Sequence, residues 1–335
     1  MTPVSASDLL DGAVVVRLPM RIRFRGISVR ESMLLHGPYG WAEFCPFPEY
    51  DDAEAARWLA CAVEAAWQPP VPVMRDAVPV NATVPAVPAA QVGAVLARFP
   101  GCTTAKVKVA EPGQRLADDL DRVAAVRAGL GPAGKVRVDA NGAWSLDDAL
   151  DALAALAGYD LEYAEQPCAA LDDLVRLRLG LARAGVNVPV AADESVRKAQ
   201  DPLRVAVAGA ADVVVIKVAP LGGVRAALEV AGRLGSDHGL GVVVSSALET
   251  SVGLATGVRL AAALPDLAYA CGLGTAALLA DDVVARPLIP VGGSIAVAVP
   301  EVDAEALART AADVDRVAWW RSRLERCIQE NSARP

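Results

Sequence analysis

Lysine, histidine and aromatic residues are scarce in this chain, and each scarcity narrows what the protein can be. The aromatic content is 4%, and only two histidines occur, His36 and His238. His36 lies in a predicted hairpin turn and His238 precedes a predicted strand, so neither is expected to be catalytic. Of the 32 basic residues only five are lysine, at positions 106, 108, 135, 198 and 217. Three of these, Lys106, Lys108 and Lys217, lie at or near the C-terminal ends of strand-like segments, which is not the distribution expected of surface residues.

Other absences exclude whole classes of protein. No run of basic residues favours nucleic acid, and the net charge is −8. No apolar run reaches the ~18 residues that a membrane span needs, and no basic segment leads into an apolar one as in a signal peptide. The six cysteines are scattered without a CxxC pair, which favours reduced thiols in the cytoplasm. We therefore expect a cytoplasmic protein with a small-molecule ligand, without nucleic-acid or membrane partners, and a monomer or small homo-oligomer.

What the chain has in quantity is apolar sequence, 54% of its 335 residues with a mean hydropathy of +0.34. Such a chain can bury a large core, and its length favours one large α/β domain with a smaller partner. Strand-like and helix-like segments alternate strictly from about residue 101, as in a barrel of βα units. A doubly wound open sheet is the competitor, but residues 111–114 do not form its glycine-rich phosphate turn.

The fold class predicted from this order is α/β, a modified TIM barrel of the (β/α)7β type with an α+β capping domain. We expect the capping domain over residues 1–95, with strands at 13–20, 22–36 and 41–47, a helix at 52–67 and an extended segment at 81–88. The barrel is expected over residues 96–290. Residues 291–335 are expected to return to the capping domain as a short strand and a helix.

Five segments within the barrel end in charged residues. They read AKVKV (105–109), KVRVDANGAW (135–144), LEYAEQP (161–167), VPVAADES (188–195) and DVVVIKV (212–218). The charges follow one another at steps of 31, 26, 28 and 24 residues, each the length of one βα unit. Because parallel strands of a barrel end at one mouth, we expect these side chains to meet there.

Three of the charges are the carboxylates Asp139, Glu165 and Asp193, one at each of three successive strand ends. Three close carboxylates stay ionised only beside positive charge, and a hard divalent cation such as Mg²⁺ is bound by such oxygen ligands. Helix capping or pairing with arginine would explain any one of them alone. Three carboxylates at the ends of three successive strands favour a metal site, in which Mn²⁺ can substitute for Mg²⁺.

The lysines complete this predicted site. Lys106 and Lys108 share one face of their strand, because side chains alternate, and Lys217 approaches from across the barrel. A lysine beside a metal and a second ammonium group has a lowered pKa and can act as a base near neutral pH.

The combination of KxK, DANGAW, EQP, ADES and a lone lysine five strands in resembles the enolase superfamily, in its muconate-lactonising subgroup. The resemblance runs from PMRIRFRG (19–26) to CGLGT (271–275). It implies that the three carboxylates bind Mg²⁺ and that Lys108 is the general base and then the acid. It also implies that Lys217 faces Lys108 across the substrate. Arg137 matches an RxD arrangement within the superfamily and has a supporting role there.

Other residues carry weaker predictions, and each has a plain alternative. Ser245 and Ser246 end the sixth strand, where the family contacts substrate, but they can also cap the next helix. Gly272 and Gly274 would let backbone amides approach a carboxylate, or simply make a turn. Residues 18–26 resemble a mobile loop over the barrel mouth whose arginines attract a dicarboxylate, or an exposed strand face. Asn141, inside the DANGAW motif, completes the set of predicted supporting residues.

The resemblance implies removal of a proton next to a carboxylate. Its most specific form here is a dehydratase (a carbon–oxygen lyase) that converts a hydroxycyclohexadiene carboxylate into an aromatic acid. A racemase of N-acylated amino acids, a dipeptide epimerase or a cycloisomerase would use the same machinery. A non-catalytic barrel that binds a metal or a carboxylate is the alternative from another class.

Overall fold

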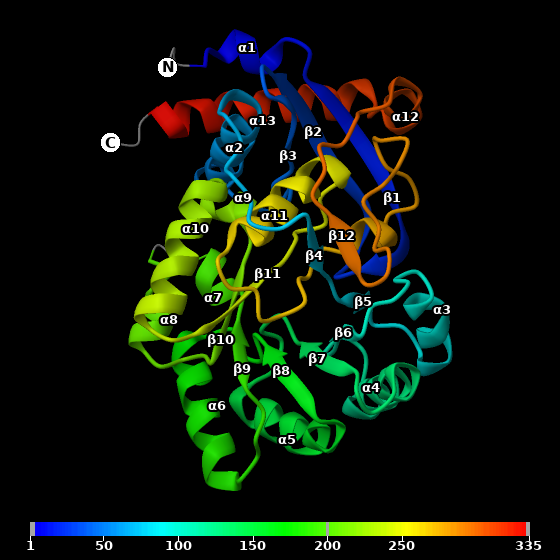
Figure 1. Cartoon of the computed structure of the whole chain (residues 1–335), viewed down its shortest axis with the longest axis vertical. Helices are drawn as coiled ribbons and strands as arrows, with labels where there is room; N and C mark the ends of the chain where they lie inside the picture. The colour runs from blue at the N-terminus through cyan, green and yellow to red at the C-terminus, as the bar shows by residue number, and fades with distance from the viewer. Residues whose placement is uncertain (1–3, 199–200, 333–335) are drawn as a thin grey trace.

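A computed structural model describes residues 4–198 and 201–332 of the chain. Figure 1 shows two regions, a sheet with helices at one end and a set of parallel strands ringed by helices at the other. The predicted fold class is confirmed, a barrel of βα units with an α+β capping domain. The predicted domain limits at residues 95 and 290 stay predictions.

The capping domain is built on an antiparallel sheet in the order β1-β2-β3. Its strands are β1 (Val14–Phe24), β2 (Ile27–Gly37) and β3 (Gly40–Phe44), preceded by α1 (Ala6–Leu10) and followed by α2 (Asp52–Trp67). The helix prediction at 52–67 is confirmed, but the predicted break near residue 21 is wrong. The chain turns instead at Arg25 and Gly26, which have φ angles of 51° and 78°. The strand periodicity of residues 21–25 hid this turn.

The barrel sheet is parallel, with its strands in the order β11-β10-β9-β8-β7-β6-β5. Two bridges close the ring, because Cys271 pairs with Val80 next to β5 and Gly272 pairs with Ser245 after β11. Residues 81–88, predicted as an extended part of the capping domain, include β5, which pairs with β6. The strands are β5 (Ala82–Val84), β6 (Thr104–Lys108), β7 (Lys135–Asp139), β8 (Leu161–Glu165), β9 (Val190–Ala192), β10 (Val213–Ile216) and β11 (Gly241–Val244).

Helices cover the outside of this ring and connect its strands (Figure 1). Ser145 is the N-cap of α5, as predicted, and its side chain accepts a hydrogen bond from the amide of Asp148. The α-helices are α3 (Val92–Leu96), α4 (Leu116–Leu130), α5 (Leu146–Leu156), α6 (Leu171–Ala184), α7 (Glu194–Arg197), α8 (Arg204–Val207), α9 (Val218–Leu221), α10 (Val224–Gly232) and α11 (Ser251–Ala263). Short 3-10 turns span Ala89–Gln91, Ala157–Tyr159 and Thr275–Leu278, and a π-helical turn spans Arg233–Asp237.

The strands alternate strictly between helix-facing and interior side chains. On β10, Val214 and Ile216 belong to the main hydrophobic core, whereas Val213 and Val215 belong to a separate cluster inside the barrel. Lys217 follows Val213 and Val215 at the same spacing of two residues, so its side chain also points into the barrel. On β6 the apolar residues at 105 and 107 belong to the main core, so the lysines between and after them point inward, as predicted.

The last part of the chain packs on the elements of the capping sheet. It forms β12 (Ser294–Ala296), which pairs with β4 (Ala77–Pro79), and then two helices, α12 (Ala304–Thr310) and α13 (Val314–Ser332). Trp320 of α13 is fully buried and packs edge-on against Phe44 of β3. Figure 1 shows α13 running across the top of the molecule beside α2. No helix within the described residues is both long and apolar enough to cross a membrane.

Candidate active site

The register of the barrel strands brings the charged residues to one level. Lys108 pairs with Asp139, and Asp139 pairs with Glu165, across β6, β7 and β8. Asp193 and Lys217 directly follow β9 and β10. These side chains are all buried. Buried charges must be paired, and every member of this set has a partner of opposite charge.

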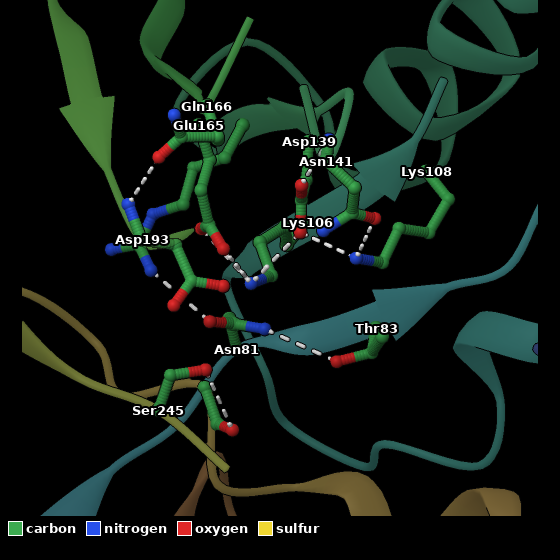
Figure 2. A network of polar contacts seen from close by, with 12 residues as sticks. Asn81, Thr83, Lys106, Lys108, Asp139, Asn141, Glu165, Gln166, Asp193 and Ser245 are labelled. Atoms are coloured by element: carbon green, nitrogen blue, oxygen red, sulfur yellow. Dashed lines mark hydrogen bonds and ion pairs between the residues drawn. The ribbon is translucent and has the colours of Figure 1, made fainter. Parts of the chain in front are cut away.

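Lys106 is the positive centre of the carboxylates. Its ammonium group donates to both oxygens of Glu165, at 2.7 and 2.9 Å, and lies 3.3 Å from Asp139 (Figure 2). Burial by itself lowers the pKa of Lys106, but the charges of Glu165 and Asp139 outweigh burial and raise it. Lys106 therefore stays charged at neutral pH.

Lys108 has the opposite tendency, although it lies on the same strand. Its ammonium group donates to Asp139 at 2.5 Å and to the side-chain oxygen of Asn141 at 2.8 Å. Burial lowers the pKa of Lys108 to about 8, and the positive charges of Lys106 and Arg25 add to this effect against the opposing charge of Asp139. A lysine that loses its proton near pH 8 is suited to general base catalysis.

On the other side of the carboxylates, Asp193 is held by two cations. Lys217 donates to one oxygen at 2.6 Å and Arg197 to the other at 3.1 Å. Burial would raise the pKa of Asp193, but these two charges outweigh burial and lower it to about 2. Lys217 follows β10 and Lys108 ends β6, with three strands between them in the sheet, so the two lysines face the site from different sides.

Two residues of the motifs position the carboxylates. The side-chain oxygen of Gln166 accepts from the backbone amides of Asp193 and Ser195, at 2.9 and 3.1 Å, and so fixes the turn after β9. The backbone amide of Asn141 donates to Asp139 at 3.0 Å. Gln166 and Asn141 have φ angles of 37° and 48°, a backbone region that costs free energy for residues with side chains. Such strain is concentrated at functional sites.

The donor set fits a divalent cation by its chemistry. Three buried carboxylates lie on or directly after neighbouring strands, and burial together with the charges of Asp139 and Asp193 raises the pKa of Glu165 to about 7. A hard cation bound by carboxylate oxygens would relieve that repulsion. Within residues 4–198 and 201–332 no three His, Cys, Asp or Glu side chains stand in a metal-binding arrangement, because ammonium groups lie between the carboxylates.

The remaining wall of the site is neutral. The hydroxyl of Ser246 donates to the carbonyl of Gly272 at 2.9 Å and lies 2.8 Å from the hydroxyl of Thr275, whereas Ser245 reaches the same carbonyl at 3.4 Å. The backbone amide of Gly272 donates to Val244, so it closes the barrel and does not face a ligand. A Cβ atom at Gly272 would lie 2.4 Å from the Ser245 hydroxyl, which explains the glycine. A Cβ atom at Gly274 would lie 3.2 Å from the backbone carbonyl oxygen of Asn81.

Arg137 lies away from this level. It is completely buried, donates to Glu162, to Asn81 at 3.1 Å and to the carbonyl of Ala270 at 2.7 Å, and stacks on Tyr163 at 4.7 Å. Asn81 and Ala270 lie on the two sides of the barrel closure, next to the paired residues Val80 and Cys271, whereas Glu162 and Tyr163 lie on β8. The predicted supporting role of Arg137 is therefore a structural one at the barrel closure.

The site opens into a cavity of about 90 Å³ between the barrel mouth and the capping domain. Lys106, Lys108, Asp139 and Lys217 line it, and Glu165 and Asp193 connect to it through the ammonium groups that they bind. Sequence reasoning missed several lining residues, namely Phe47, Tyr50, Thr83, Arg197 and Thr275. Of these only Arg197 carried a signal, its position four residues after Asp193 on the short helix α7.

The predicted loop 18–26 forms the end of the β1–β2 hairpin. Phe24 lies with its ring 5.0 Å from the ammonium group of Lys108, and Arg25 lies 3.5 Å from Glu194. The hairpin tip therefore covers the cavity from the capping side. Whether this segment is more mobile than its surroundings stays a prediction.

Comparisons with known proteins agree with this geometry. Residues 89–302 match the family model described as enolase C-terminal domain-like, and residues 15–66 match the enolase N-terminal domain-like model. The chain belongs to the enolase superfamily, whose members generally bind a divalent metal.

Its curated relatives include the o-succinylbenzoate synthase of Mycolicibacterium smegmatis, which is 56% identical over 321 residues, 96% of each chain. The o-succinylbenzoate synthase of Mycobacterium ulcerans is 55% identical over 326 residues, 97% of this chain and 96% of the relative. The crystal structure of the muconate lactonizing enzyme from Pseudomonas fluorescens, complexed with muconolactone, has a TM-score of 0.74 at 22% identity. The match covers 90% of this chain and 98% of the muconate lactonizing enzyme, and this similarity supports the fold alone.

Proposed function

We propose that this protein catalyses the o-succinylbenzoate synthase reaction, the syn-dehydration of 2-succinyl-6-hydroxy-2,4-cyclohexadiene-1-carboxylate to 2-succinylbenzoate. The observation that carries the proposal is the placement of Lys108 and Lys217 in one cavity, on different sides of three buried carboxylates. The near full-length identity with o-succinylbenzoate synthases favours this substrate over others that the same machinery would accept.

Lys108 performs both proton transfers. Its neutral amine takes the proton from the ring carbon that bears the carboxylate, and the resulting ammonium group gives a proton to the departing hydroxyl, which leaves as water. No net proton is gained or lost by the enzyme. Loss of water makes the ring aromatic, so product formation itself supplies driving force.

Lys217 contributes positive charge to the side of the substrate opposite Lys108. The substrate carboxylate gains negative charge as the proton leaves, and a fixed cation in a buried site stabilises that charge strongly. Lys106 keeps Glu165 and Asp139 oriented and lowers the pKa of Lys108. A divalent cation, which we propose is Mg²⁺ with Mn²⁺ as a substitute, would be held by Asp139, Glu165 and Asp193 and would supply further positive charge beside the substrate carboxylate.

The proposed context follows from the reaction. Its product class belongs to menaquinone biosynthesis, and we propose a cytoplasmic enzyme that acts as a monomer or small homo-oligomer on a small dicarboxylate. Neither nucleic acid nor a membrane is required as a partner.

The specific observation in favour of a second activity is the pair of lysines itself. Racemisation of an N-acylamino acid or epimerisation of a dipeptide needs one proton-transfer group on each face of the α-carbon. Lys108 and Lys217 meet that requirement by position.

One assay separates the two activities. The purified enzyme with Mg²⁺ is given the cyclohexadiene substrate, whose absorbance falls on dehydration, and in parallel N-succinyl amino acids, whose optical rotation falls on racemisation. We expect dehydration to exceed racemisation by kcat/KM. Absence of dehydration alongside efficient racemisation would replace the proposal by the second activity.

A further inference from the structure

The loop between β11 and α11 forms one wall of the cavity and is held from the capping domain. Ala247 and Leu248 of this loop line the cavity. Leu248 has a φ angle of 64°, which is unfavourable for a leucine and persists only where the surroundings enforce it. The backbone amide of Ala247 is held by the Glu249 side chain at 2.7 Å.

Arg30 of β2 holds the carbonyl groups of this loop. Its guanidinium is 1% exposed and donates to the carbonyl of Leu248 at 3.2 Å and to that of Ala247 at 3.4 Å. The same group donates to the carbonyl of Cys45 and lies 4.4 Å from the ring centre of Phe47. Phe47 is one of the capping-domain residues that line the cavity. One side chain thus contacts both walls of the cavity.

Glu43 of β3 holds the amide groups that follow. Its carboxylate accepts from the backbone of Thr250 at 3.0 Å, from the Thr250 hydroxyl at 2.6 Å and from the backbone of Gly253 at 2.8 Å. This is the first turn of α11, where free amides attract negative charge. A Cβ atom at Gly253 would lie 2.5 Å from the Glu43 carboxylate, so the approach requires a glycine.

We propose that Arg30 and Glu43 are positioning residues that set the distance between the Phe47 wall and the Ala247–Leu248 wall and thereby determine affinity for the substrate. Neither is among the described residues that line the cavity. The proposal rests on the proposed function and adds the part of the molecule that shapes the pocket for the substrate's distal, succinyl-bearing side.

The contacts that Arg30 and Glu43 make with residues 247–253 form a joint between the capping domain and the barrel loop. The lysines and carboxylates of the site do not depend on this joint in the same way. Lys108 and Lys217 lie on or directly after barrel strands, and their partners lie on neighbouring barrel strands. Loosening the joint should therefore weaken substrate binding more than it slows proton transfer, which appears as a rise in KM with little change in kcat.

The test uses Arg30→Lys and Glu43→Gln, each of which keeps most of the side-chain volume. We expect KM to rise about 10-fold and kcat to stay within about 3-fold of wild type. The matched control is Arg75→Lys, because Arg75 donates to the carbonyls of Ala261 and Leu264, each at 2.7 Å, at the far end of the same helix. The control should leave KM unchanged.

Gly253→Ala is a second route to the same result if a charge variant does not fold. Its methyl group would lie 2.5 Å from the Glu43 carboxylate and 2.8 Å from the Cβ atom of Glu249, so it displaces side chains that hold this loop while the charges of Arg30 and Glu43 remain. We expect the same rise in KM.

A readout without substrate separates this proposal from the proposed function. Amide hydrogen exchange of residues 245–253, followed by mass spectrometry in the ligand-free enzyme, should speed up in Arg30→Lys and Glu43→Gln and stay unchanged in Arg75→Lys. An inactive wild-type enzyme would overturn the proposed function alone. Unchanged exchange and KM, an equal rise in the Arg75→Lys control, or a fall of kcat at constant KM would overturn the joint.

Discussion

The two halves of the barrel mouth differ in kind. From β6 to the end of β10 the mouth carries lysines and carboxylates in mutual ion pairs; we call this the charged half. From the end of β11 to the closing segment it carries Ser245, Ser246, Gly272 and Thr275, which we call the neutral half. The charged half concentrates preorganised charge on rigid strands, where it is strongest. The neutral half offers space and weak hydrogen bonds. We infer that the charged half carries out proton transfer and stabilises charge, whereas the neutral half accommodates the shape of the substrate.

The sharpest test of the charged half is Lys108→Ala. We expect kcat to fall by more than the ~10²–10⁴-fold that one general base contributes, because the same group also acts as the acid. Steady-state dehydration kinetics measure the loss. Lys135→Ala is the control, since Lys135 is an exposed lysine at the opposite end of β7. Near-normal dehydration in Lys108→Ala would transfer the base to Lys106 or Lys217.

Removal of the cation tests the carboxylates of the same half. Chelation with EDTA should abolish dehydration, and Mg²⁺ or Mn²⁺ should restore it. Asp193→Asn should weaken metal affinity by at least the ~10–100-fold seen for lost outer-shell partners, because a neutral amide is a poorer ligand for a hard cation. Calorimetric titration with Mg²⁺ checks this independently of turnover. Full activity of metal-free enzyme would contradict the assignment.

Variants of Lys217 separate the effect of its positive charge from proton transfer within the charged half. Lys217→Ala should cost ~10²–10³-fold in kcat, the usual loss for one electrostatic stabiliser, and Lys217→Arg should cost less because it keeps the charge. Arginine cannot act as a base, so deuterium exchange into a racemisable substrate should survive in Lys217→Arg for one enantiomer only. Equal losses in the two variants would mean that Lys217 itself moves a proton.

The acid limb of activity tests the lowered pKa of Lys108. Lysine is a base only when neutral, so kcat/KM should rise with pH along an acid limb. This limb should level off at an apparent pKa of about 8 or below, against the ordinary lysine pKa of 10.5. Each pH unit below the limb should cost about tenfold. A bound cation adds positive charge and can only move the limb lower. A limb near the ordinary value would show that the pKa of Lys108 is not lowered.

The neutral half should give the smallest effect. Ser246→Ala removes hydrogen bonds to Gly272 and Thr275. We expect a rise in KM of about 5-fold, the equivalent of one neutral hydrogen bond of ~1 kcal/mol, with kcat unchanged. A loss in kcat as large as that of Lys217→Ala would erase the distinction between the two halves.

Sequence reasoning located the charged half well because strand geometry is periodic. Alternation along β6 and the βα repeat length place Lys108, Asp139 and Glu165 together without knowledge of packing. It did not locate Tyr50 or Arg30, whose roles depend on contacts between segments far apart in the chain. The Arg25–Gly26 turn was missed because alternating residues continue across it. The use of the Gly272 amide in barrel closure depends on register, which spacing does not reveal.

The capping domain is joined from the two ends of the chain, and this has a consequence for the newly made protein. Arg316 of α13 forms an ion pair with Glu31 of β2, 285 residues earlier, and Trp320 donates to the same carboxylate. At ~5–20 residues per second, a ribosome makes these partners of Glu31 on the order of 15–60 s after it. The hairpin that covers Lys108 thus gains these contacts only after the barrel strands have been synthesised. The barrel strands are therefore all synthesised before these contacts of the cap can form, so a fully supported cover over the active site has to follow the synthesis of α13.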